Sequence, residues 1–189
     1  MRRNRILLAA GILLAAGGTA RAQMATAVLS AVNGACGNCA VGISIGSPTD
    51  QTTWHAQFAV GATSAQQQQA QAALANFPLA TWNAQQAAQQ QAQTAIAGGL
   101  QIVSTSTPAL NGTYAATPAA QGEINAVVTY IEVNGTFPGG AGTMPWYDAA
   151  GTPHTFPNVT EFKAFATAEA NFVAAVTLGQ AFTQPATIP

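Results

Sequence analysis

Charged residues are scarce in this chain of 189 residues: they make up 6% of it, against roughly a quarter of an average soluble protein. There are also only two cysteines and two histidines. A zinc-finger array and a disulfide-dense scaffold are excluded, because each needs many copies of these residue types. Five Lys and Arg residues are too few for a nucleic-acid groove. What is abundant is apolar, since 49% of the residues are hydrophobic, which is compatible with one packed domain or two small ones.

The N-terminus has the features of a secretory signal peptide. Three arginines within the first five residues precede an apolar stretch over residues 6–16, and Ala20 and Ala22 supply the small side chains of a cleavage site. The stretch is about half as long as a membrane-spanning helix requires. We therefore predict a cleaved signal over residues 1–22 and an exported protein. Its removal leaves Lys163 as the one basic side chain, which predicts no binding to nucleic acid or to a membrane surface.

Residues 23–62 are predicted to form a small antiparallel β module. The apolar, partly β-branched run over residues 24–32 and the run over residues 40–46 indicate two strands around a turn-rich loop. Alternating side chains over residues 53–58 indicate a third strand, with Trp54 on its buried face.

Two Ala/Gln-rich segments within residues 63–99 predict a helical hairpin. Ser64 and Gln67 have the spacing of a capping box, Pro78 ends the first helix, and Asn83 caps the second. The side chains are small enough for close packing of the two helices. The alternative is a polar low-complexity linker, because such a stripe buries little apolar area.

Residues 100–179 are predicted to form a helical C-terminal module, followed by a flexible tail over residues 180–189. A Thr-Pro pair at residues 117–118 indicates the start of an amphipathic helix, and Asn158 indicates the cap of another. Between these helices, a long Gly/Pro-rich loop over residues 136–157 carries several aromatic side chains. The predicted fold class is therefore α+β, with the amphipathic helices packed against the aromatic loop.

Cys36 and Cys39 form a C-x-x-C pair in a Gly/Asn-rich segment. In an exported protein two cysteines most simply form a disulfide, and the alternatives are free thiols, a redox site or a metal site. A redox site requires a helix N-terminus that lowers the pKa of the first thiol. A metal site requires two further ligands, and His55 and His154 lack the spacing for this role. We predict a structural disulfide, no metal and no cofactor.

Asp148 and His154 are the residues that a catalytic triad could use. No serine stands in the sequence context of a nucleophile elbow, so we interpret the pair as hydrogen-bonding residues that hold the loop. Glu123 and Glu132 project from opposite faces of their predicted helix, which gives no support to a glycosidase-like pair of carboxylates. We predict that the protein is not an enzyme, and a hydrolase is the weakest alternative.

The aromatic loop is the candidate recognition surface. Trp146 and Tyr147 could stack on a sugar ring or on a partner's side chain, and loops longer than about 12 residues are often functional. The alternative is that these rings cover the core, which a domain with few large aliphatic residues needs. Together with Asp148 and His154 they are the predicted contacts to a ligand or partner.

Several motifs of the chain occur together elsewhere: LNGTYA at residues 110–115, YIEVNGTFPGG at 130–140, PWYDAAGTPHTFPN at 145–158 and FKAFATAEANFVAAV at 162–176. In these motifs the chain resembles an uncharacterised family of short prophage-type and alphaproteobacterial proteins. Residues 50–77 resemble a segment of small proteins from phage tail gene clusters. The resemblance implies a setting in virion or tail structure, and it implies no catalytic residue. A signal peptide departs from this pattern, because tail proteins assemble in the cytoplasm.

We therefore predict a non-enzymatic structural or interaction protein of the phage or prophage tail-associated type. The alternative is an exported bacterial binding module that recognises a glycan or an envelope protein through the aromatic loop. The expected partners are proteins, including further copies of the chain, and in the alternative a glycan. The expected location is the periplasm or the medium, with the virion as the alternative.

Overall fold

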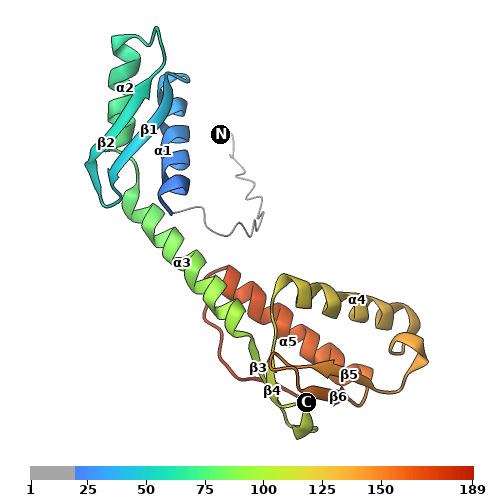
Figure 1. Cartoon of the computed structure of the whole chain (residues 1–189). Helices are drawn as coiled ribbons and strands as arrows, with labels where there is room; N and C mark the ends of the chain where they lie inside the picture. Colours follow the sequence, from blue (N-terminus) through green and yellow to red (C-terminus); the bar gives the residue numbers. More distant parts are fainter. Residues whose placement is uncertain (1–19) are drawn as a thin grey trace, which may run out of the picture. The chain divides into compact units, whose positions relative to one another are not determined.

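The computed structural model describes residues 20–189. Most of the predicted signal peptide thus lies outside the described residues, and its cleavage site falls in the first turn of a helix. The chain divides into two compact units with their boundary after Ala80, and each is described by itself. Both units combine helices with small sheets (Figure 1), which confirms the predicted α+β class.

The first unit consists of two helices and a β-hairpin. Its elements are α1 (Ala20–Cys36), β1 (Ala40–Ser47), β2 (Asp50–Phe58) and α2 (Ser64–Ala75). The two strands pair antiparallel, with Ile45 opposite Trp54, and α1 packs on β1 while α2 packs on β2. Trp54 is buried, whereas Ser44 and His55 on the other face are exposed. The strands predicted over residues 40–46 and 53–58 are confirmed.

The segment over residues 24–32, predicted as a strand, is part of helix α1. Its buried residues recur every fourth position, at Met24, Val28, Val32 and Cys36. This spacing places all of them along one face of a helix, whereas a half-buried strand would bury every second residue. The strand prediction was wrong because it weighed the β-branched residues and overlooked this period.

Helix α2 begins with a capping box displaced by one residue from the predicted one. Thr63 is the N-cap, since its hydroxyl accepts a hydrogen bond from the Gln66 backbone N–H, and the Gln66 side chain accepts one from the Thr63 N–H. The buried residues of this helix are Ala70 and Leu74. Its packing partners are α1 and β2, in place of the second Ala/Gln-rich helix that the sequence analysis paired with it. The apolar stripe of α1 offers a larger surface than the next helix, in which no residue is buried.

The second unit contains most of that next helix, α3, and everything after it. Its elements are α3 (Leu79–Gly98), β3 (Leu100–Ser104), η1 (Pro108–Leu110), β4 (Gly112–Tyr114), α4 (Pro118–Asn134), η2 (Pro138–Gly140), β5 (Met144–Tyr147), β6 (Pro153–Phe156), α5 (Val159–Thr177) and β7 (Ala186–Ile188). Strand β3 is central in a three-stranded sheet, antiparallel to β4 and parallel to β7. Strands β5 and β6 form a separate antiparallel hairpin.

Helices α4 and α5 begin at the predicted caps. The Thr117 hydroxyl accepts a hydrogen bond from Ala120 N–H, and the Asn158 side chain accepts one from Glu161 N–H. Gly135 ends α4 in the left-handed conformation, with φ 72°, which a residue with a Cβ rarely adopts. Capping pattern and apolar spacing were therefore sufficient to locate both helices.

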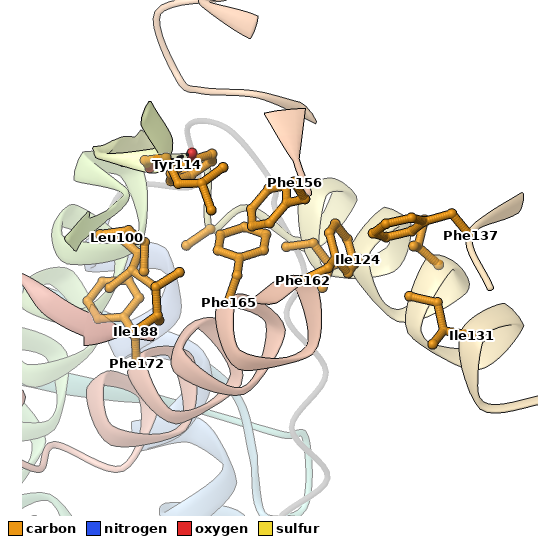
Figure 2. Close-up of a cluster of buried hydrophobic side chains, with 14 residues drawn as sticks. Leu100, Tyr114, Ile124, Ile131, Phe137, Phe156, Phe162, Phe165, Phe172 and Ile188 are labelled. Carbon is orange, nitrogen blue, oxygen red and sulfur yellow. Dashed lines mark hydrogen bonds between the residues drawn. The ribbon is translucent and has the colours of Figure 1, made fainter. Parts of the chain in front are cut away.

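Aromatic side chains form the core of the second unit (Figure 2). The fully buried ones are Tyr114, Phe137, Phe156, Phe162, Phe165 and Phe172. Phe165 lies at the centre of the cluster, with its ring centroid 4.8 Å from that of Tyr114 and 5.2 Å from that of Phe156. Helix α5 supplies three of these rings, so the aromatic cluster that was expected in this region is confirmed.

Residues 136–157, predicted as a loop, contain the β5–β6 hairpin. Pro145 and Pro153 lie within its strands, and prolines argue against a strand unless it lies at a sheet edge, as both strands of a two-stranded sheet do. The sequence analysis therefore found the aromatic side chains of this segment and missed the hairpin.

Residues 180–189 do not form the predicted flexible tail. They contain β7, which pairs with β3 from Ala186 to Ile188. Ile188 is buried beside Leu100 and Phe172 (Figure 2). The Ser104 hydroxyl also donates a hydrogen bond of 2.6 Å to the Pro189 carbonyl oxygen. Phe182 and Ile188, the two large apolar residues of this segment, were the signal that the sequence analysis did not use.

Candidate functional site

The predicted contact residues come together on the β5–β6 hairpin. Trp146 lies opposite His154 and Tyr147 opposite Pro153, and Asp148 begins the turn between the strands. Because neighbouring residues of a strand point to opposite faces, Trp146 and Tyr147 have different surroundings. The inner face of the hairpin thus carries Trp146 and Phe156, and its outer face carries Tyr147.

The Asp148 carboxylate organises the turn. Its Oδ1 atom accepts hydrogen bonds from the backbone N–H groups of Thr152, at 2.7 Å, and Ala150, at 2.9 Å. These bonds, the one from Thr152 foremost, hold the pKa of Asp148 below its ordinary value. The other oxygen, Oδ2, lies 3.3 Å from Nε2 of His154. The carboxylate therefore joins the turn to the second strand.

His154 is held at both ring nitrogens. Nδ1 lies 2.6 Å from the Ala109 carbonyl oxygen, and Nε2 faces Asp148. Neither nitrogen is directed at a hydroxyl group that could act as a nucleophile, so the pair lacks the third member that a triad requires. The geometry is that of residues that hold a turn against the η1 segment.

Strand β4 allows this close approach because it begins with a glycine. A Cβ atom at Gly112 would lie 3.1 Å from Nε2 of His154 and 3.6 Å from Oδ2 of Asp148. Beyond it, the ring of Tyr114 lies 5.4 Å from the imidazole, and its hydroxyl donates to the Leu110 carbonyl oxygen. Burial raises the pKa of Tyr114. The polar pair thus lies directly beside the aromatic core.

A groove of about 280 Å³ lies between β5 and the N-terminal half of α4. Its lining residues are Ala115, Ala120, Glu123, Met144, Pro145, Trp146 and Tyr147. Trp146 is half-buried, with its ring edge-on to Phe162 at 5.3 Å, so it covers the core. Tyr147 is 65% exposed. The two alternatives for the aromatic loop therefore apply to different side chains, with Trp146 as core cover and Tyr147 available to a ligand.

The sequence analysis did not connect Glu123 with this surface. It lies in the second turn of α4, one residue before the buried Ile124, and it is one of the residues that line the groove. The preceding Thr-Pro pair located the helix, but no pattern showed that β5 would lie beside its first turns. Only the tertiary fold brings this carboxylate to the aromatic hairpin.

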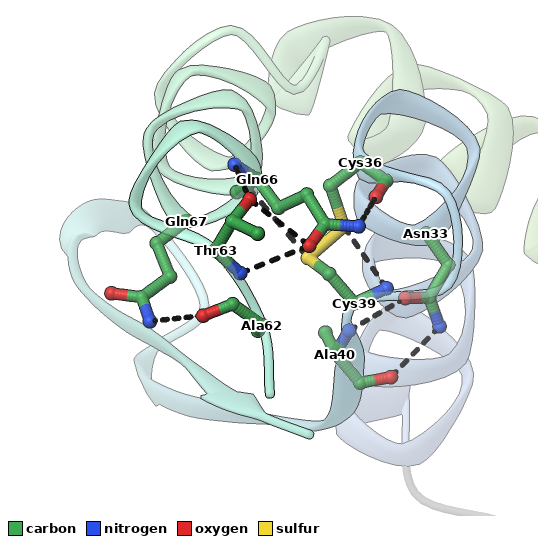
Figure 3. Close-up of a disulfide and its surroundings, with 8 residues drawn as sticks. All are labelled: Asn33, Cys36, Cys39, Ala40, Ala62, Thr63, Gln66 and Gln67. Carbon is green, nitrogen blue, oxygen red and sulfur yellow. Dashed lines mark hydrogen bonds between the residues drawn. A yellow bond between two sulfur atoms is a disulfide. The ribbon is translucent and has the colours of Figure 1, made fainter. Parts of the chain in front are cut away.

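Cys36 and Cys39 lie at the other candidate site, in the first unit (Figure 3). Their Sγ atoms are 2.05 Å apart, the distance of a disulfide. Both residues are buried, and Gln66 donates a hydrogen bond from its side-chain nitrogen to the Cys36 carbonyl oxygen, at 3.2 Å. The predicted loop between two strands is instead the connection from α1 to β1, because the segment before Cys36 is helical. The pair thus links three elements of the first unit.

Within residues 20–189, no three His, Cys, Asp or Glu side chains lie close enough to hold a metal ion. In the same part of the chain, no helix has both the length and the apolar character needed to cross a membrane.

Comparison with known proteins gives no family for the chain. No family model matches it, and neither a curated protein nor a solved structure matches it significantly. The resemblance of its C-terminal motifs to tail-associated proteins therefore stays a prediction.

Proposed function

We propose that the chain is a non-enzymatic interaction protein whose second unit binds a glycan in the groove beside Tyr147. The observation that carries this proposal is an exposed aromatic ring next to a groove with a carboxylate on its opposite wall. An aromatic face can stack on the apolar face of a sugar ring, and a carboxylate accepts hydrogen bonds from hydroxyl groups. Tyr147 and Glu123 supply these two kinds of contact.

The surroundings of Tyr147 favour such binding. Its neighbour Trp146 is fixed against Phe162, so the strand that carries Tyr147 is ordered before a ligand arrives, which lowers the entropic cost of association. Ala115 and Ala120 leave room at the groove because their side chains are small. The scarcity of basic residues disfavours a polyanionic ligand and is compatible with a neutral sugar.

A glycan array followed by calorimetry on the strongest ligand tests the proposal. Tyr147→Ala is expected to weaken binding about tenfold or more, as a lost stacking contact would. Tyr130→Ala is the matched control, because Tyr130 is also exposed, on α4, but does not line the groove. Equal affinity of the Tyr147 variant and the unchanged protein, or an array without any bound glycan, would rule the proposal out.

A second candidate function is a structural role in a phage or prophage tail. The four C-terminal motifs of the resemblance fall in the second unit, where they supply β4, the end of α4, the β5–β6 hairpin and α5, and residues 50–77 supply β2 and α2 of the first unit. The protein should then be found by mass spectrometry in tail particles from an induced lysogen. Its presence in periplasm or medium alone would favour the exported binding module, with which a disulfide is compatible.

A further inference from the structure

A buried carboxylate without a partner lies between α4 and α5, away from the groove beside Tyr147. Glu169 is on the inner face of α5 with Phe165 and Phe172, and it is 4% exposed. Its Oε1 atom has no hydrogen-bond partner among the described residues. Burying a carboxylate in this way is costly, and burial raises the pKa of Glu169 to about 7. Because an unpaired buried carboxylate destabilises the fold, its presence at this position suggests a role in binding a ligand.

Glu169 lines a second groove, of about 460 Å³. This volume lies in the range of small-ligand sites, roughly 300–1,000 Å³. Gln121 and Asn125 of α4 form its polar wall, and Val173 and Ala174 are part of its apolar wall on α5. The Gln121 side-chain nitrogen already donates to the Ala116 carbonyl oxygen, so its own carbonyl oxygen remains as an acceptor. The groove therefore offers hydrogen-bond acceptors at its carboxylate and amide, beside short apolar side chains.

No lysine or arginine of residues 22–189 pairs with this carboxylate. Lys163 is the one lysine, and its Nζ atom pairs with Oε1 of Glu132 at 2.6 Å. A divalent metal ion is a poor fit, because Glu169 belongs to no cluster of three metal-ligating side chains in the described part of the chain. A cation that needs one carboxylate and a few neutral acceptors fits the groove better.

We propose that this groove binds an alkylammonium group, either of a free alkylamine or of a lysine side chain on a partner protein, with Glu169 as its counter-ion. The ammonium group has three N–H donors, which the Glu169 carboxylate and the Gln121 amide oxygen can accept. The methylene stem lies along Val173 and Ala174, as lysine stems commonly do on apolar surfaces. Ligand binding then satisfies the buried carboxylate oxygen, which no group among the described residues does.

Titration of the whole protein with n-butylamine and with Nα-acetyl-lysine amide, followed by NMR at pH 8, tests this proposal. At that pH the Glu169 carboxyl group is largely ionised and an alkylamine is still protonated. Both probes are expected to shift signals of residues around Glu169, and 1-butanol, which has the same stem without charge, is expected not to. Binding of the lysine probe alone would identify a partner's lysine as the ligand, and binding of butylamine as well would identify a general alkylammonium site.

Two variants distinguish a loss of ligand binding from a loss of folding. Glu169→Gln keeps the shape and removes the charge, so binding should weaken about tenfold or more while the circular dichroism spectrum is unchanged. Ala174→Leu fills the groove from its exposed side and should have the same effect. Glu132→Gln, which changes an exposed carboxylate on α4 that lines neither groove, is the control. Unchanged affinity in Glu169→Gln, equal binding of 1-butanol, or no binding of either amine would overturn the proposal.

Discussion

The two units of this chain build their cores from different materials. The first packs the small aliphatic side chains of α1 against a hairpin with one buried tryptophan, and it joins the end of α1 to β1 through the Cys36–Cys39 pair. The second has no cysteine and has six fully buried aromatic rings in its core, three of them from α5. Each large ring buries much apolar area, so a unit rich in aromatic side chains can be stable without a disulfide.

Among residues 20–189, neither unit depends on ion pairs between charged side chains. The one pair that involves a lysine among residues 20–189, Lys163 with Glu132, is exposed, and exposed pairs contribute roughly 0–1 kcal/mol. Side-chain hydrogen bonds to the backbone take their place, as with Gln51, whose side chain donates to the carbonyl oxygens of Leu74 and Phe77 at the end of α2. Stability should therefore change little with salt concentration.

The variant Phe165→Ala is expected to destabilise the second unit strongly and to leave the first unit unaffected, which is the largest effect we predict. Phe165 contacts four other aromatic rings. Its replacement by alanine should therefore lower the free energy of unfolding by about 4 kcal/mol, a typical value for a buried phenylalanine. Hydrogen exchange should accelerate throughout the second unit and not in β1 and β2. Phe182→Ala is the control, because Phe182 is partly buried and contacts Phe172 at the edge of the cluster. Similar costs for both variants would show that the core does not depend on this central ring.

A pH-dependent loss of stability is expected from Glu169. Its pKa is about 7 in the folded chain, above its ordinary value of 4.5, so the folded state holds the proton more tightly than the unfolded state does. The stabilisation from this proton is complete below pH 4.5 and is lost as the pH rises through 7. The free energy of unfolding should therefore fall by on the order of 2 kcal/mol between pH 5 and pH 8.

Urea unfolding of Glu169→Gln measures this effect. The variant should be more stable than the unchanged protein at pH 8, and its slope with pH over this interval should largely disappear. Asp148 contributes in the opposite direction, because its pKa is lowered, and its contribution is lost only in acid. An unchanged slope in Glu169→Gln would assign the pH dependence to another group.

Sequence patterns predicted elements better where the signals agreed than where they conflicted. Helices α4 and α5 were found because cap and apolar spacing agree, and β2 because Trp54 stands in a regular alternation. The helix over residues 24–32 of α1 was missed because its β-branched residues suggested a strand, while the four-residue spacing of its buried residues indicates a helix. Competing signals of this kind are decided by tertiary packing, in this case against α2 and β1.

The candidate sites could be predicted only where their residues lie close together in the sequence. Trp146, Tyr147, Asp148 and His154 lie within nine residues, so the sequence could group them, and Cys36 and Cys39 likewise. Glu169 could have been noticed as a carboxylate on the apolar stripe of α5. Its groove could not be inferred, because the other wall comes from α4, more than forty residues earlier.

Removal of the disulfide is expected to destabilise the first unit moderately and to leave the second unit unaffected. The double substitution Cys36→Ser and Cys39→Ser opens a very short loop, for which chain entropy gives about 2 kcal/mol. The loss should appear in the first unit, as faster hydrogen exchange at the end of α1 and in β1, and not in the second unit. If the exchange rates in β1 do not change, the contacts between α1 and β1 are sufficient without the covalent link.

The smallest expected effect is a coupling between a helix cap and the disulfide. The Gln66 side chain accepts hydrogen bonds from the N–H and hydroxyl of Thr63 and donates one to the Cys36 carbonyl oxygen. Thr63→Ala should cost about 1 kcal/mol, as the loss of an N-cap usually does. In combination with the cysteine double substitution, its cost should differ from this value by about 0.5 kcal/mol, because the two changes share Gln66.

Thr117→Ala, which removes the cap of α4, is the matched comparison in the second unit. Its hydroxyl contacts the N–H of Ala120 and no residue of the disulfide segment, so its cost should add to that of the cysteine substitutions without coupling. Urea unfolding of the single and combined variants gives both coupling energies. If the changes in the free energy of unfolding are also additive for Thr63→Ala, the cap and the disulfide stabilise the first unit independently, and Gln66 does not couple them.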